Sequence, residues 1–127
     1  MLPVKQNRCE VLDGFMETHT IPEVQTETDL LAATEPLEAT YVLFYAEWCP
    51  FSRMFLPVFN QFGQTHTGSY LRVLLEDNDE LWEKYCIKVV PTVLFFQHDV
   101  VAARLDGTSG RGLTGQELQK FIATTSK

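Results

Sequence analysis

Apolar residues along this chain follow two different repeats, which predict strands in some segments and helices in others. Residues 41–45 (YVLFY) are continuously apolar and favour β-structure, which predicts a strand buried on both faces. From residue 50 the apolar positions recur every three or four residues, which predicts an amphipathic helix over 50–64. Its apolar stripe consists of Phe51, Met54, Phe55, Val58, Phe59 and Phe62. Pro57 lies inside this helix and is expected to kink it, because proline cannot donate the internal hydrogen bond.

Shorter patterns of the same two kinds fill the rest of the chain. The further predicted strands are residues 21–25, 70–75, 93–97 and 100–105. The further predicted helices lie near residues 29–32 and 79–85 and after residue 114. Their predicted N-caps are Thr26 or Thr28, Asn78 or Asp79, and a capping box of Thr114 and Glu117. The order β-α-β-α-β-α-β-β-α predicts an α/β fold, with a central mixed sheet of four to five strands covered by helices on both faces.

The length of the chain and the lack of pattern near its N-terminus predict one domain with an extension. The chain has 127 residues, of which 45% are hydrophobic, and this is enough for one ordinary domain with its own core. Residues 1–20 show no sustained period and are interpreted as an N-terminal extension, and residues 21–127 as the domain. No stretch is apolar enough to span a membrane or to act as a signal peptide. We therefore expect a cytoplasmic protein.

The charge of the chain excludes two classes of partner. The net charge is −7, and residues 9–52 contain carboxylates but no lysine or arginine. Nucleic acids and anionic membranes both require basic patches, so neither is expected as a partner. The three histidines are scattered and give no metal-ligand spacing, even with Cys9. We expect neither a metal nor a cofactor.

Cys49 is the residue whose position carries the strongest chemical signal. It lies where the predicted central strand is followed by the helix over 50–64, and Pro50 suits the first helical position. The free N–H groups and the dipole of a helix start favour an anion, and the anion that a cysteine can offer is the thiolate. The chain has three cysteines, an odd number, so a disulfide framework is not expected. Cys49 is therefore interpreted as a nucleophile.

Several motifs around Cys49 resemble those of the thioredoxin family over roughly residues 21–124. Residues 44–49 (FYAEWC) match the family's strand-to-site run, and Pro57 matches its helix-kinking proline. Residues 90–92 (VPT) match its cis-proline loop, which faces the nucleophile, and Gly107 matches a glycine that lines the substrate groove. The resemblance implies a thioredoxin fold and thiol–disulfide exchange. It also implies a substrate groove made by Trp48, Pro50, Phe51, Val90, Pro91 and Gly107.

The chain departs from the family pattern at two positions that bear on activity. Ser52 stands where the family has a second cysteine, and Leu43 where it has a buried aspartate. Cys49 can form a mixed disulfide, but Ser52 cannot resolve it, because an alcohol is a poor nucleophile at neutral pH. The Ser52 hydroxyl can instead donate a hydrogen bond to the thiolate. With Leu43 present, Arg72 is interpreted as a strand-end surface charge.

A monothiol protein needs another thiol to release its mixed disulfide. The candidates are a small thiol, a thiol of the partner protein, Cys86 and Cys9. Cys86 lies five residues before Pro91, at the edge of the expected site, and is interpreted first as a partly buried filler. Cys9 can take part only if the extension folds over the site.

Three functions remain open from the sequence. The first is thiol–disulfide exchange through Cys49 in a Cys-X-X-Ser motif, on a cysteine-containing protein or a small thiol. The second is a redox-inactive binding module, in which Trp48, Phe51 and Val90 form an apolar contact patch. The third is a redox sensor, in which an oxidised Cys49 is capped by Cys9 or Cys86. An exposed, reactive Cys49 favours the first, and a buried, unreactive one the second. A monomer or a weak dimer is expected.

Overall fold

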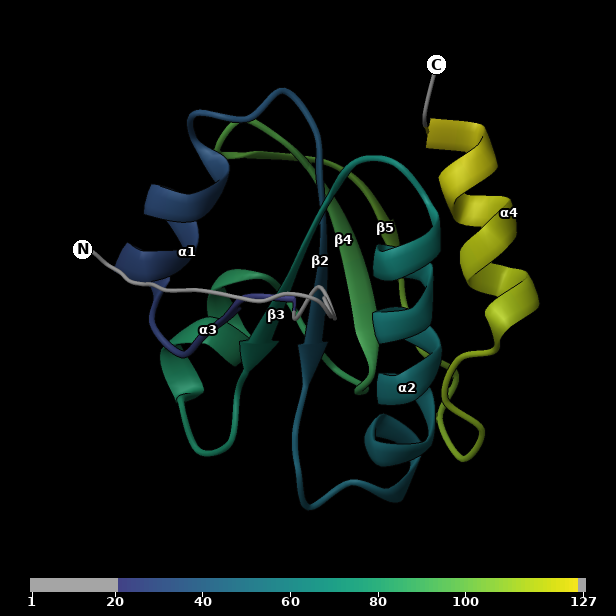
Figure 1. The fold of residues 1–127 in the computed structure, drawn as a ribbon. Helices are drawn as coiled ribbons and strands as arrows, with labels where there is room; N and C mark the ends of the chain where they lie inside the picture. Colours follow the sequence, from purple (N-terminus) through teal and green to yellow (C-terminus); the bar gives the residue numbers. More distant parts are fainter. Residues whose placement is uncertain (1–20, 126–127) are drawn as a thin grey trace, which may run out of the picture.

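The computed structural model describes residues 21–125, which form a five-stranded sheet with helices on both faces (Figure 1). In chain order the elements are β1 (Glu23–Val24), α1 (Glu27–Thr34), β2 (Thr40–Tyr45), α2 (Pro50–Thr65), β3 (Ser69–Leu74), α3 (Asp79–Lys84), β4 (Thr92–Gln97), β5 (Val100–Leu105) and α4 (Gly115–Thr125). This is the predicted order, with boundaries shifted by one or two residues for most elements. The interpretation of residues 1–20 as an extension lies outside the described residues.

The strand β2 is the centre of the sheet, whose strand order is β1-β3-β2-β4-β5. It pairs in parallel with β3 on one side and antiparallel with β4 on the other, so the sheet is mixed. All six of its residues are buried, as the continuous apolar run predicts. The two-residue strand β1 lies at one edge of the sheet, where Pro22 does not interrupt a central ladder.

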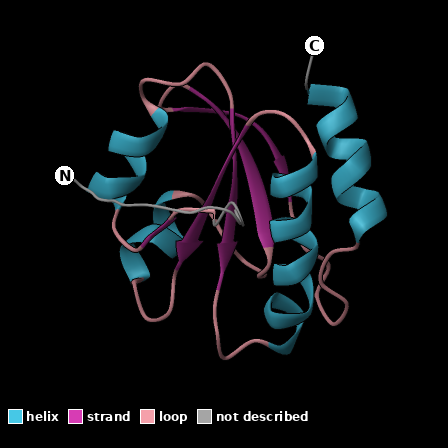
Figure 2. Ribbon diagram, in the orientation of Figure 1, coloured by secondary structure: helices cyan, strands magenta, loops and turns pink. Residues whose placement is uncertain are grey.

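The helices cover the sheet in two layers, which Figure 2 shows on either side of the strands. Successive β2 side chains point to opposite faces, so one strand serves two cores. On the face covered by α1 and α3, Val42 and Phe44 pack in a cluster with Leu30 and Leu81. On the face covered by α2 and α4, the cluster consists of residues such as Tyr41, Leu43, Tyr45, Phe55, Phe59 and Leu118. Both layers hold β2 in place, and with it the turn that follows.

The helix starts use the side chains that the sequence suggests. Thr26 caps α1 by accepting a hydrogen bond from the Asp29 N–H at 3.1 Å, and Asn78 caps α3. Thr114 and Glu117 form the capping box of α4, each side chain accepting a backbone N–H of the other residue. The sequence left Thr26 or Thr28 open as the cap of α1, and Asn78 or Asp79 as the cap of α3. The structure shows that the first of each pair is the cap.

Two predictions about side chains within the helices and strands are wrong. Met54 is 71% exposed, because no other element among residues 21–125 covers this part of the α2 stripe. Arg72 is not a strand-end surface charge: it lies within β3, and its side chain is 17% exposed. Its guanidinium lies 3.2 Å from the Glu23 carboxylate and donates to Asn60 Oδ1, also at 3.2 Å.

A polar network therefore surrounds the position that Leu43 occupies. Leu43 is fully buried and is the register partner of Arg72 on β3. The Tyr45 hydroxyl donates to Glu23, which in turn pairs with Arg72. Burial, followed by the Glu23 hydrogen bond and charge, raises the pKa of Tyr45. Because residue 43 is apolar, β2 offers no carboxylate to Arg72 at this position. Arg72, which lies on β3, instead contacts Glu23 on β1 and Asn60 on α2.

Candidate functional site

Cys49 lies at the junction of β2 and α2, where the sequence predicts it. It is the N-cap of α2, with extended backbone (φ −94°, ψ 120°), and Pro50 follows as the first helical residue. Its N–H donates to the Ala46 carbonyl at 3.2 Å, which closes the turn after β2. The Cys49 side chain makes no capping hydrogen bond to α2, so its sulfur is not used to satisfy the helix start. Only 8% of the residue is exposed.

The sulfur of Cys49 faces the loop before β4. Its thiol donates to the carbonyl oxygen of Val90, with 3.6 Å between sulfur and oxygen. The Val90–Pro91 peptide bond is cis, and both residues are buried. β4 is antiparallel to β2, so the start of β4 lies at the same edge of the sheet as the end of β2. The topology thus places the cysteine against the proline loop.

Ser52 occupies a fully buried position one turn into α2. Its hydroxyl oxygen accepts a hydrogen bond from the N–H of Ala46 at 3.3 Å. This contact ties the first turn of α2 to the end of β2, so it holds the turn that carries Cys49. The structure therefore assigns Ser52 a contact with the backbone of the turn.

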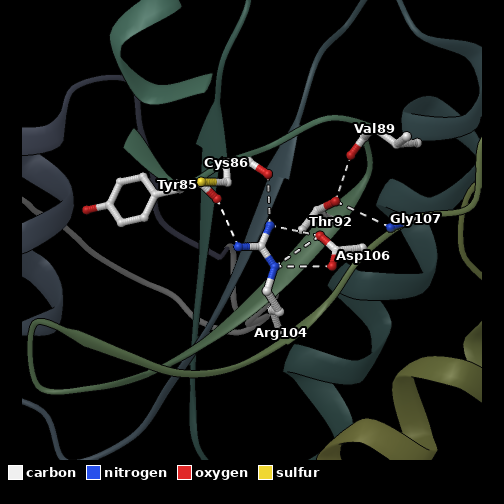
Figure 3. Close-up of polar contacts among 7 residues, drawn as sticks. All are labelled: Tyr85, Cys86, Val89, Thr92, Arg104, Asp106 and Gly107. Carbon is white, nitrogen blue, oxygen red and sulfur yellow. Dashed lines mark hydrogen bonds and ion pairs between the residues drawn. The ribbon is translucent and has the colours of Figure 1, made fainter. Parts of the chain in front are cut away.

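Gly107 packs against the proline loop closely enough to exclude a side chain. A Cβ placed on Gly107 would lie 2.3 Å from the backbone oxygen of Pro91. The Gly107 N–H donates to the Thr92 hydroxyl at 3.3 Å, and that hydroxyl donates to the Val89 carbonyl at 2.6 Å (Figure 3). A small residue is required here because the strand end lies directly against the loop.

Two stacked tryptophans, Trp48 next to Cys49 and Trp82 on α3, form an aromatic surface beside the site. Trp48 is 57% exposed and stacks on Trp82, with ring centroids 6.2 Å apart and planes at 15°. The Trp82 indole N–H donates to the Glu76 carbonyl at 3.1 Å, and the Glu76 carboxylate accepts the Glu47 N–H at 2.8 Å. Trp48 is therefore a surface residue whose ring is held in place by Trp82, and not a core residue.

The remaining predicted groove residues surround Cys49 at different depths. Pro50 is exposed, and Phe51 is half-buried. Phe51 packs on Gly112, where an added Cβ would lie 2.8 Å from the Phe51 Cβ. The structure thus brings Trp48, Pro50 and Phe51 around the start of α2, while the loop at residues 90–91 faces it from β4.

The interpretation of Cys86 as a partly buried filler is wrong. Cys86 is exposed and is a free thiol, as is the buried Cys49. It follows α3 in a left-handed backbone conformation, with φ 53°. A hollow of about 410 Å³ is lined by Cys86, Lys88, Val89, Arg104, Asp106 and Gly107. Cys9, the other proposed resolving thiol, lies outside the described residues.

Arg104 is a residue of this region that the sequence did not single out. It lies on β5, and its guanidinium contacts backbone carbonyls at the end of α3 as well as Asp106. The available signal was the spacing: Arg104 and Asp106 are two residues apart on a strand and its extension, which places them on one face. The backbone carbonyl partners have no sequence signal.

Within the described part of the chain, no cluster of three or more histidine, cysteine or acidic side chains has the geometry to hold a metal ion. Over the same residues, no helix has the length and apolar character needed to cross a membrane.

The sheet order, the cysteine at the start of α2 and the facing cis-proline loop define a thioredoxin-fold protein. A family model described as Thioredoxin matches residues 24–124, which is most of the chain. The chain belongs to the thioredoxin family.

Individual relatives are distant but extend over much of the chain. Thioredoxin-1 of Caenorhabditis elegans is 26% identical over 84 residues, which cover 65% of this chain and 73% of that protein. The chloroplastic thioredoxin M-type of Brassica napus is 24% identical over 116 residues, which cover 90% of this chain but 64% of that protein, or less than two thirds. A mutant thioredoxin from Halobacterium salinarum has a similar structure, with a TM-score of 0.74, 21% identity and coverage of 90% of this chain and 97% of its own.

Proposed function

We propose that this chain is a thiol–disulfide exchange protein whose single nucleophile is Cys49. The observation that carries the proposal is the environment of the Cys49 sulfur: it lies at the start of α2, takes no part in capping the helix, and lies 3.6 Å from the Val90 carbonyl on the cis-proline loop. The helix start offers free backbone N–H groups, and the loop offers backbone groups to an extended substrate.

The reaction is a sulfur exchange that needs no external oxidant. Cys49 loses its proton to water, and its thiolate attacks one sulfur of a substrate disulfide. A new bond forms between Cys49 and that sulfur, the old disulfide bond breaks, and the leaving thiolate takes a proton from water. Ser52 cannot attack the resulting mixed disulfide, so a second thiol must release Cys49.

The groove residues act on the substrate rather than on the sulfur. Trp48 and Phe51 provide apolar contact on either side of the start of α2, and the Val90 backbone pairs with an extended peptide. Gly107 has no side chain and so lets the chain after β5 lie directly against the proline loop. Ser52 holds the turn through Ala46 and so keeps Cys49 at the helix start.

The substrate class that we propose is a cysteine-containing protein or a small thiol, with the chain acting as a monomer or a weak dimer. Release of Cys49 by a second thiol requires a supply of reduced thiols. We therefore propose that the protein acts in a reducing compartment, the cytoplasm being the obvious one.

The test uses a variant with Cys9→Ser and Cys86→Ser, so that Cys49 is the single thiol. We expect it to form a mixed disulfide with a peptide that carries a thionitrobenzoate-activated cysteine, with release of the coloured thionitrobenzoate anion. The adduct should persist until glutathione is added. The matched variant with Ser52→Cys in the same background should resolve its own adduct, and a variant with Cys49→Ser should release no colour.

One observation favours a redox-inactive binding module as the second candidate. Cys49 is only 8% exposed, whereas the neighbouring Trp48 is 57% exposed, so the accessible surface at the site is aromatic rather than sulfur. Under this reading the native protein would not react with iodoacetamide or with the activated peptide, while unfolding in urea would make Cys49 reactive.

A further inference from the structure

The side chain of Arg104 joins the end of α3 to the end of β5. Its Nη1 donates to the carbonyl of Tyr85 at 3.0 Å, and its Nη2 donates to the carbonyl of Cys86 at 3.1 Å (Figure 3). Its Nε and Nη2 also donate to the Asp106 carboxylate, at 2.8 to 3.1 Å. One guanidinium therefore binds two backbone carbonyls and a carboxylate, which only the planar fork of arginine can do at once.

These contacts fix one end of the loop that faces Cys49. Tyr85 is the C-cap residue of α3 and Cys86 follows it, so both carbonyls lie just past the end of the helix, where carbonyls have no partner within the helix. The other end of the loop is fixed by Thr92, whose hydroxyl links the Val89 carbonyl to the Gly107 N–H. Asp106 and Gly107 are adjacent, so both attachments lead to the same strand end.

Val90 lies between the two attachments. Its carbonyl oxygen is 3.6 Å from the Cys49 sulfur, and its backbone is the edge that would pair with a substrate peptide. Reactive geometry of this kind is sensitive to displacements of less than 1 Å, and it depends on the residues that hold the reacting groups in place.

We propose that Arg104 is a positioning residue for thiol–disulfide exchange: it holds the end of α3 so that the Val90 backbone stays in register with the Cys49 sulfur and with an incoming peptide. The inference rests on the proposed function of Cys49. Arg104 itself touches neither the sulfur nor the substrate.

The test compares two disulfide substrates, because only one of them needs the Val90 edge. The activated peptide disulfide pairs with the loop, whereas bis(2-hydroxyethyl) disulfide is too small to do so. In the Cys9→Ser, Cys86→Ser background, we expect Arg104→Gln to slow attack on the peptide by about tenfold or more, with a much smaller effect on the small disulfide. Arg104→Lys should not restore the peptide rate, since an ammonium cannot bind both carbonyls and the carboxylate in this geometry.

The matched control is Arg111→Gln. Arg111 is also an exposed arginine that pairs with a carboxylate, that of Glu117, and its other side-chain hydrogen bond goes to Thr108 instead of to the end of α3. The Arg111→Gln variant removes the same charge as Arg104→Gln. It should leave the ratio of the peptide rate to the small-disulfide rate at the wild-type value. Urea unfolding of each variant shows that the compared proteins are folded under the assay conditions.

Three results would overturn the inference: an equal loss of both rates in Arg104→Gln, a ratio that matches Arg111→Gln, or full rescue by lysine. If the wild type reacts with neither disulfide, the proposed function itself fails. In that case, amide hydrogen exchange tests whether Arg104 positions the loop, independently of any reaction at Cys49. Faster exchange in Arg104→Gln confined to residues 86–92 supports it, and unchanged exchange there refutes it.

Discussion

Replacing Gly107 with alanine tests whether the proline loop is held by direct contact with the end of β5. The new Cβ would lie 2.3 Å from the Pro91 backbone oxygen and 3.4 Å from Val89 Cγ1. The first distance is about 1 Å shorter than ordinary van der Waals contact, and the atom that it meets is backbone. Such a clash cannot be relieved by a rotamer change, so either Gly107 or the proline loop must move.

We expect Gly107→Ala to lower the free energy of unfolding by about 2 kcal/mol, within the range observed for added methyl groups in packed sites. Movement of the loop should also change the rate at which Cys49 is alkylated by iodoacetamide. Urea unfolding followed by the fluorescence of Trp48 and Trp82 measures the first effect. Alkylation of the variant lacking Cys9 and Cys86 measures the second.

Gly110→Ala is the matched control. Gly110 has φ 80°, and nothing lies within 4 Å of the position that its Cβ would take. Gly110→Ala should lower the free energy of unfolding by about 1 kcal/mol, because alanine disfavours this backbone conformation and glycine does not. It should leave the alkylation rate of Cys49 unchanged. The reasoning is refuted if Gly107→Ala is as stable as the wild type, or if Gly110→Ala changes the reactivity of Cys49 as much as Gly107→Ala does.

Three further predictions use other residues. Cys86→Gly should be as stable as the wild type or more stable by up to about 1 kcal/mol in urea unfolding, because φ 53° is a conformation that favours glycine; a clear loss would contradict this. Thr92→Val keeps the shape but leaves two backbone groups without their partner, and should cost about 1–3 kcal/mol by the same assay, whereas an unchanged stability would show that those groups find other partners. The hydrogen bond from Arg111, more than any other contact, lowers the pKa of Glu117 from its ordinary value of 4.5. The ionised Glu117 therefore stabilises the fold above that value, and the stability advantage of the wild type over Glu117→Gln should decline as the pH falls below 4.5; an advantage that persists unchanged in acid would refute the assignment.

Much of the fold follows from local patterns in the sequence. The apolar run at β2, the helical stripe of α2 and the capping box of α4 each predict an element that the structure contains. These signals are readable because the periods of helices and strands differ and because capping residues act on their own helix. Met54 fits the stripe but is exposed, because the pattern gives the width of the apolar face and not which part of it other elements cover.

The candidate site was predictable in part. The sequence predicts Cys49, Ser52 and Trp48 as site residues from their position after β2 and from the family motif, and they stand at the start of α2 or directly before it. The partners of these residues were not predictable from pattern: Ser52 contacts the Ala46 N–H, and Trp48 stacks on Trp82. Such contacts depend on distances between segments far apart in the chain or on the local turn geometry, which no residue period encodes.

By itself, the sequence determined the class of fold and indicated Cys49 as the candidate nucleophile, because both inferences rest on residue types at fixed separations along the chain. The tertiary structure alone decided that Arg72 is held inside a network with Glu23, that Cys86 is exposed, and that Arg104 donates to the backbone carbonyls of Tyr85 and Cys86. The partners of Arg104 at the end of α3 are backbone carbonyls, and every residue carries the same carbonyl. Only the packing of β5 against the end of α3 determines which ones an arginine can reach.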